Sequence, residues 1–211
     1  MKEEIGARST AERTISEASS WILEFRARLA APPPARLPVS NARSASVLVP
    51  LYVDAGQLWT ILTKRSETLP HHRGQIAFPG GASEVGEDAW GAALRETEEE
   101  IGINRSQVLE IGELDEVDTP SGFRIIPCVG AVPTGVETRI NDEEIAEVFS
   151  VPLLAFSDVK VVEERQVTID DVERTIRIYH VGRRQVWGLT ARIVQNLLQR
   201  LGIDTPVFST E

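Results

Sequence analysis

The segment from Gly81 to Ile103 constrains the fold and the chemistry of this chain more than any other stretch. Residues 88–100 contain no proline and a single glycine, so we predict a helix there. On a helix, Glu96, Glu99 and Glu100 fall at positions i, i+3 and i+4, which places their carboxylates on one face. The spacing therefore predicts a helix with a concentrated acidic face.

This acidic face is unfavourable for the helix that carries it. Like charges at this spacing repel, at about 0.2–0.5 kcal/mol for each pair in an isolated helix. Gly102 is typical of a helix end, so the carboxylates lie where the helix dipole is already negative. A hard divalent cation such as Mg²⁺ or Mn²⁺ prefers oxygen donors of this kind and would relieve the repulsion. The alternative is a solvated acidic face, which is common in a chain with 32 aspartates and glutamates.

The complete spacing resembles a known signature, the Nudix box of hydrolases that cleave nucleoside diphosphates linked to another group. The matching residues are small and charged ones at fixed intervals: Gly81, Glu87, Arg95, Glu96, Glu99, Glu100 and Gly102. The one departure is Thr97, where the family usually has an aliphatic residue, and we expect its methyl group to point inward. The resemblance implies the Nudix fold, an α+β arrangement with a mixed β-sheet sandwiched between α-helices.

The same resemblance implies roles for the acidic helix. Glu96 and Glu100 are the usual ligands of Mg²⁺ or Mn²⁺ in the family, and Glu99 shares that role and is a candidate catalytic residue. Arg95 lies four residues before Glu99, so an ion pair could orient that carboxylate. The alternative for Arg95 is an exposed surface charge. These positions predict a pyrophosphohydrolase that depends on a divalent metal ion.

The general base varies between Nudix subfamilies and can lie outside the box. Glu144 is a candidate for this role, and an ordinary helix-surface acid is the alternative. Glu84 and Glu87 flank the loop before the helix and could add an outer-sphere or third metal contact.

A second motif stands directly upstream of the box. It runs from Leu62-Thr63-Lys64-Arg65-Ser66 to Phe78-Pro79-Gly80-Gly81 and resembles the extra motif of coenzyme A pyrophosphatases within the Nudix family. Together with similar segments downstream, the resemblance covers about residues 45–201. It implies hydrolysis of coenzyme A or acyl-coenzyme A to 3′,5′-ADP and 4′-phosphopantetheine or its acyl form. Two alternatives remain: another nucleoside diphosphate substrate such as ADP-ribose or a dinucleotide, and a non-catalytic ligand-sensing or interaction module. Such modules typically lack acidic positions of the box, and this chain has them all.

Coenzyme A carries a 3′-phosphate in addition to its diphosphate, so basic groups beyond the metal site are expected. We predict that Arg65, His72 and Arg73 bind the substrate, since the planar donors of arginine suit phosphate. Without the family motif, His72 would be interpreted as a structural, hydrogen-bonded histidine. Gly81 joins this set because a glycine allows close backbone approach.

Composition sets the remaining limits. The 211 residues suit one domain, 41–205, preceded by an N-terminal helix and a proline-rich connector over 1–40. The formal net charge of −10 argues against non-specific binding to nucleic acid or to anionic membranes. The single cysteine, Cys128, is expected in the core rather than as a catalytic thiol, and with no secretory signal in view it indicates a cytoplasmic protein. The expected partner is a small-molecule nucleotide, with a homodimer left open.

Hydrophobic patterning predicts the remaining elements. The N-terminal helix, over 9–29, carries Trp21, Ile22 and Phe25, and we expect it to pack on the domain or on a second subunit. The other elements are strands over 45–53, 58–64, 108–117, 123–132, 161–169 and 174–181, a short helix over 142–149, and a last helix from about 188 to 201.

Overall fold

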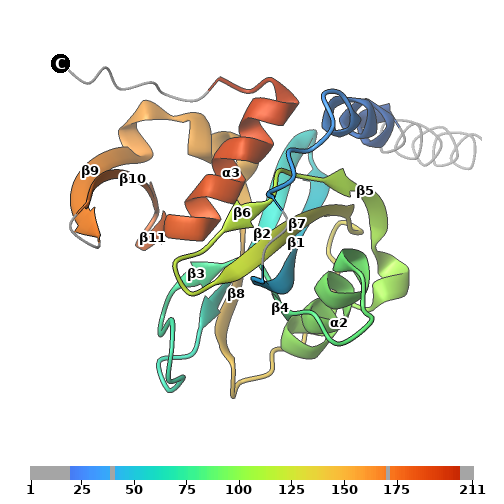
Figure 1. The fold of residues 1–211 in the computed structure, drawn as a ribbon. Coiled ribbons are helices and arrows are strands. Elements are labelled where there is room, and N and C mark those ends of the chain that lie inside the picture. The colour runs from blue at the N-terminus through green and yellow to red at the C-terminus, as the bar shows by residue number, and fades with distance from the viewer. Residues whose placement is uncertain (1–19, 39–40, 170–171, 205–211) are drawn as a thin grey trace, which may run out of the picture.

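The computed structural model describes residues 20–38, 41–169 and 172–204. A large mixed sheet lies between helices, with a smaller sheet beside it (Figure 1). The elements in chain order are β1 (Arg43–Asp54), β2 (Gln57–Arg65), β3 (Ile76–Ala77), β4 (Gly80–Ala82), α2 (Ala89–Ile101), η1 (Arg105–Gln107), β5 (Leu109–Glu113), β6 (Val117–Asp118), β7 (Phe123–Ala131), β8 (Ile145–Pro152), η2 (Leu153–Ser157), η3 (Val159–Val161), β9 (Val162–Ile169), β10 (Val172–Val181), β11 (Arg184–Trp187) and α3 (Gly188–Leu201).

Strand β1 organises the large sheet, whose order is β3-β2-β1-β7-β5. It runs parallel to β7 and antiparallel to β2 and β4. Alternate residues of β1 point to opposite faces. Val47 and Val49 enter the main core beneath α3, whereas Leu48 packs with Ala93 of α2 and with Cys128. The two faces thus hold different helices, as Figure 1 shows, which confirms the predicted fold class.

The predicted acidic helix is α2, and both of its ends are capped, the C-terminal one by Gly102 as predicted. The Asp88 side chain accepts a hydrogen bond from the amide of Gly91 at the N-terminus (2.7 Å). Gly102 ends the helix in the left-handed conformation with φ 73°, where a side chain would be strained. Thr97 is fully buried and its hydroxyl donates to the carbonyl of Ala93 (2.6 Å), so the residue that departs from the family pattern fits without an unpaired polar group.

Residues 20–30 form a helix that belongs to the main hydrophobic core. Leu29 is 1% exposed, and Trp21, Ile22 and Phe25 pack against the same core. The predicted packing of this helix on the domain is confirmed for these residues, and the part predicted before residue 20 lies outside the described residues. Burying apolar side chains here contributes about 1.5–3 kcal/mol for each one that is fully buried.

The proline-rich connector is extended and held along the domain. The amide of Ala35 donates to Asp115 (2.7 Å), and its carbonyl accepts from the amide of Glu116 (3.0 Å). Leu37 donates its amide to the Glu116 carboxylate (2.7 Å), and Arg200 of α3 also contacts Asp115. These contacts explain why the chain bends away from strand geometry between β5 and β6, where the sequence predicts one continuous strand over 108–117.

The helix predicted over 142–149 is wrong. Residues 142–144 form a turn, and β8 begins at Ile145. β8 pairs antiparallel with β2, so that Val148 lies opposite Thr63 and Phe149 opposite Leu62. β-branched and aromatic side chains favour a strand, and pairing with a segment distant in the sequence outweighs the local helix propensity of the glutamates and alanine.

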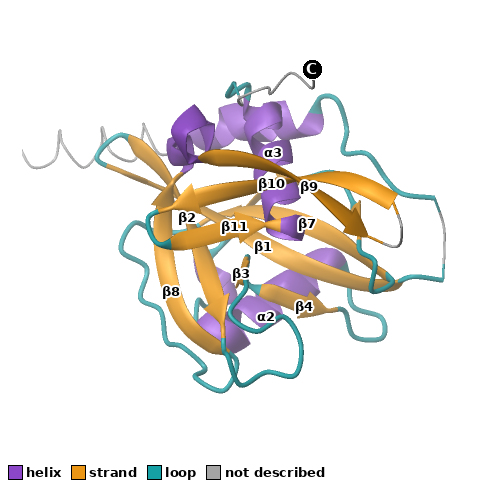
Figure 2. Cartoon of the chain, turned by 90° about the vertical axis from the view of Figure 1, so that its left-hand side faces the viewer, coloured by secondary structure: helices purple, strands orange, loops and turns teal. Residues whose placement is uncertain are grey.

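The C-terminal part forms a three-stranded antiparallel sheet, β11-β10-β9, that packs beside α3 (Figure 2). The predicted β9–β10 hairpin is confirmed, although its turn at 170–171 lies outside the described residues. The sequence did not indicate β11, which is four residues long. Among the described residues, no helix is long and apolar enough to span a membrane.

Candidate active site

Two consecutive glycines bring the carboxylates of α2 against the sheet. The amide of Gly80 donates to Glu100 Oε2 (3.1 Å). At Gly81, a Cβ atom would lie 2.4 Å from the Glu96 carboxylate carbon, so glycine lets that carboxylate lie directly against the backbone. Glu99, by contrast, is directed toward solvent, with 58% of its side chain exposed. The shared acidic face is therefore real, but its three carboxylates differ in burial.

Burial controls the protonation of the two inner carboxylates. The pKa of Glu100 is raised to about 7, first by burial and then by the nearby charges of Glu96 and Glu144, while the Gly80 amide and Arg65 act in the opposite sense. The pKa of Glu96 is also raised, chiefly by burial, with Arg95 opposing the shift and Glu99 and Glu144 adding to it. Both groups favour the charged form less than an ordinary glutamate, so a cation placed between them would recover that cost.

Arg95 links the carboxylates of the box. Its guanidinium donates to Glu96 (2.8 Å) and to Glu99 (3.2 Å), which confirms the predicted ion pair with Glu99. It also makes two bonds to Glu87 (3.1 and 3.0 Å) and one to the carbonyl of Ala82 (3.0 Å). The hydrogen bonds from Arg95 lower the pKa of Glu87. Glu87, which the sequence left as a possible metal contact, is thus engaged in holding Arg95.

Arg65 and Glu144 also lie near Glu100. The Arg65 guanidinium is 3.5 Å from Glu100 Oε1. Glu144 precedes β8 and is close enough for its charge to act on both Glu96 and Glu100. Its carbonyl accepts the amide of Ser66 (2.8 Å), which joins this turn to the end of β2.

The end of α2 is tied to the same turn through the backbone. The amide of Asn141 donates to the carbonyl of Glu100 (2.9 Å), and the amide of Arg139 donates to that of Ile101 (2.8 Å). These carbonyls would otherwise lack helical partners. The turn that carries Glu144 is consequently held at a fixed position relative to the helix.

The loop over 66–75 carries the remaining predicted substrate contacts. His72 and Arg73 are both exposed. His72 has φ 57° and its Nδ1 lies 3.0 Å from Gln75 Oε1, while Arg73 donates to the carbonyl of Leu69 (2.6 Å). Their contacts are thus within the loop, and neither touches the carboxylates of α2, unlike Arg65.

Comparison with known proteins decides the family. The NUDIX domain matches residues 42–172, more than half of the chain. A Photorhabdus laumondii protein named Uncharacterized Nudix hydrolase NudL is 34% identical over 186 residues, covering 88% of this chain and 98% of its own length. The chain belongs to the Nudix hydrolase family. It is therefore a pyrophosphohydrolase of the nucleoside diphosphate-X type.

Two further matches agree. A Yersinia enterocolitica protein of the same name is 34% identical to this Nudix hydrolase over 195 residues, covering 91% of this chain and 99% of its own. In fold, the chain is similar to the crystal structure of a MutT/nudix family protein from Enterococcus faecalis, with a TM-score of 0.53 at 20% identity, over 79% of this chain and 64% of that one.

Nudix hydrolases use divalent metal ions, and the donor set of this Nudix hydrolase fits one. Glu96 and Glu100 are adjacent, partly desolvated carboxylates. Mg²⁺ is commonly bound by one or two carboxylates together with substrate phosphates. In the part of the chain that the structure describes, no three His, Cys, Asp or Glu side chains are already gathered into a coordination shell. The protein therefore offers two inner carboxylates, with Glu99 available from solvent.

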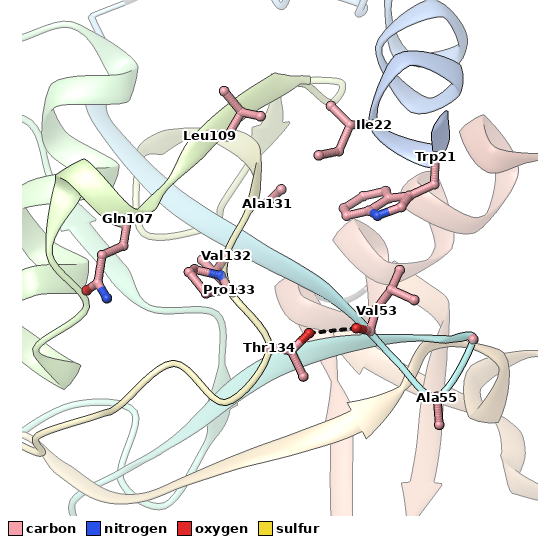
Figure 3. Close-up of a pocket in the computed structure, with 11 residues that line it drawn as sticks. Trp21, Ile22, Val53, Ala55, Gln107, Leu109, Ala131, Val132, Pro133 and Thr134 are labelled. Atoms are coloured by element: carbon pink, nitrogen blue, oxygen red, sulfur yellow. Dashed lines mark hydrogen bonds between the residues drawn. The ribbon is translucent and has the colours of Figure 1, made fainter. Parts of the chain in front are cut away.

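Two other features of this Nudix hydrolase stand apart from the carboxylates. A cavity of about 490 Å³ lies between the N-terminal helix and the β1–β2 hairpin, lined by Trp21, Val53 and Thr134 among others (Figure 3). None of the predicted site residues lines it. Cys128 is fully buried, as predicted, and burial raises the pKa of its thiol, so it is unsuited to nucleophilic chemistry.

Proposed function

We propose that this protein hydrolyses the diphosphate bond of coenzyme A or acyl-coenzyme A, giving 3′,5′-ADP and 4′-phosphopantetheine or its acyl form. One observation carries the proposal: residues of the motif that resembles coenzyme A pyrophosphatases contact Glu100 of the Nudix box. From that motif, the guanidinium of Arg65 and the amide of Gly80 both reach the Glu100 carboxylate. This contact supports a single site built from the upstream motif and the Nudix box.

In the proposed mechanism, Glu96 and Glu100 hold one or more Mg²⁺ or Mn²⁺ ions, with Glu99 as a further ligand. A bound divalent ion neutralises phosphate charge and lowers the pKa of water. Arg95, held by Glu87, orients Glu96 and Glu99. These residues carry the electrostatic part of the reaction.

Glu144 is the proposed general base. It is close enough to act electrostatically on both inner carboxylates, and its turn is fixed by the backbone bond to Ser66. A base near the two inner carboxylates can accept a proton from an attacking water.

Selection of the substrate is assigned to Arg65, His72 and Arg73, with Gly81 allowing close approach. His72 and Arg73 are exposed on the loop that joins β2 to β3, so they can meet a phosphate beyond the diphosphate. Arg65 stays beside Glu100 and faces the diphosphate. The 3′-phosphate of coenzyme A is the group that the loop would recognise.

The test is hydrolysis by the full chain with Mg²⁺ or Mn²⁺, using coenzyme A, dephospho-coenzyme A, ADP-ribose and an adenine dinucleotide, with the products separated by chromatography. Coenzyme A should yield 3′,5′-ADP. Its kcat/KM should exceed that of dephospho-coenzyme A by about tenfold or more, the scale of one hydrogen bond to a charged group. Equal efficiencies would replace this proposal by the alternative, a pyrophosphatase for ADP-ribose or dinucleotides.

A further inference from the structure

An exposed tryptophan stands at the junction of β11 and α3. Trp187 is 44% exposed, whereas Val186 beside it on β11 is fully buried. The backbone of Trp187 is fixed on both sides, because it pairs with Ile178 of β10 and forms the N-cap of α3. The indole is therefore an apolar surface that is carried by a fixed backbone and partly open to solvent.

This junction is tied to the strand that leads into the active site. The buried hydroxyl of Thr190, in the first turn of α3, donates to the carbonyl of Ile76 in β3 (2.9 Å). Gly80, which donates to Glu100, follows Ile76 by four positions in the chain. That length of chain spans at most about 14 Å when fully extended. The start of α3 is thus within reach of a ligand whose diphosphate lies at the carboxylates.

Open space adjoins the glycine that follows the tryptophan. Gly188 has φ 62°, and no atom beyond its chain neighbours and its own helix backbone lies within 4 Å of the place where its Cβ would be. It lines a cavity of about 350 Å³ between α3 and the β9–β10 hairpin. The cations at this cavity are engaged, since Arg177 pairs with Glu164 (2.7 Å) and Arg192 with Asp118 (3.3 Å). A ligand near the start of α3 would consequently gain more from the exposed indole of Trp187 than from these two arginines.

We propose that Trp187 stacks on the nucleobase of the substrate and so determines its selectivity for a nucleotide. Every base has a flat π-face, so stacking favours a base over a base-free sugar phosphate without reading its identity. The inference rests on a nucleotide substrate, as the proposed function does, but not on coenzyme A itself. The competing role is a structural one, in which the indole merely covers Ile178, which is 3% exposed.

The experiment compares AMP with ribose 5-phosphate, which differ only by the base, as ligands of the full-length protein in titration calorimetry. The variants are Trp187→Ala and Trp187→Phe, with Leu154→Ala as the control because Leu154 is also an exposed apolar side chain (54%) on a short helical turn. Trp187→Ala should weaken AMP binding by about 5- to 150-fold and leave ribose 5-phosphate unchanged. Trp187→Phe and Leu154→Ala should bind both ligands as the unaltered protein does.

Two outcomes would overturn the proposal. One is an unaltered protein that binds AMP no more tightly than ribose 5-phosphate. The other is a Trp187→Ala variant that keeps the full preference for AMP, even if its melting temperature falls, which would assign Trp187 the structural role. Neither outcome depends on turnover of coenzyme A, so a failure of the proposed function would leave this comparison intact.

Discussion

Helix α2 and the loop over 66–75 flank the same site but are built in opposite ways. The charges of α2 are interlocked: Arg95 alone contacts Glu87, Glu96 and Glu99. The exposed side chains of the loop, His72 and Arg73, contact only the loop itself in the interactions described. A network of this kind fixes positions for chemistry, whereas exposed side chains can adapt to a ligand. Under the proposed function, we therefore expect the helix to set the reaction type and the loop to set the choice of substrate.

The substitution with the largest expected effect on the role of α2 is Glu100→Gln. Turnover should fall by about 10²- to 10³-fold, because a key electrostatic group is lost from a desolvated site. Steady-state kinetics at saturating substrate would measure this. Glu98→Gln is the matched control on the same helix, since Glu98 contacts Asn104 rather than the site (2.6 Å), and it should keep normal turnover. Full activity of Glu100→Gln, or of the unaltered protein with excess chelator, would contradict the metal assignment.

Arg95→Ala tests whether the network orients the carboxylates. We expect turnover to drop by about 10- to 100-fold, the usual effect of removing a group that supports metal ligands. The double variant with Glu87→Gln should be no worse than Arg95→Ala alone, because Glu87 acts through Arg95. Additive losses in kcat would show that Glu87 has a separate role at the metal.

Arg73→Ala tests whether the 66–75 loop recognises the 3′-phosphate of the substrate. It should raise the KM for coenzyme A by about tenfold, while kcat and the kinetics of dephospho-coenzyme A stay unchanged, since one charged hydrogen bond to the 3′-phosphate is lost. Arg183→Ala, at an exposed arginine of the β10–β11 turn, serves as the control. A fall in kcat with both substrates would place Arg73 with the catalytic network instead.

Leu29→Ala should have the smallest effect on turnover and yet a large one on stability. Removing this buried side chain should lower the free energy of unfolding by about 2–5 kcal/mol. Leu23→Ala, at a residue that is 64% exposed in the same helix, should change it by less than about 0.5 kcal/mol. Denaturant unfolding of both variants would measure the difference, and equal stabilities would separate the N-terminal helix from the core.

The sequence predicted α2 accurately because its signals are local: a helical stretch without proline and the terminating Gly102. It failed at residues 142–149 because pairing with β2, about 85 residues earlier in the chain, decides the conformation there. Side-chain partners were the hardest to foresee. The interval from Glu87 to Arg95 belongs to the recognised pattern, but only the folded loop shows that Glu87 pairs with Arg95.

The backbone bonds at the end of α2 have a consequence for the timing of turnover. Moving the turn before β8 would break the bonds from Arg139 and Asn141 and leave helix-end carbonyls without partners, at a cost of about 1–3 kcal/mol for each buried one. The contact between the end of α2 and the turn before β8 should therefore persist through the catalytic cycle. Entry of the substrate and departure of the products are then expected on the side of the 66–75 loop, and the mobility of that loop, rather than of the helix, would set any slow step that follows bond cleavage.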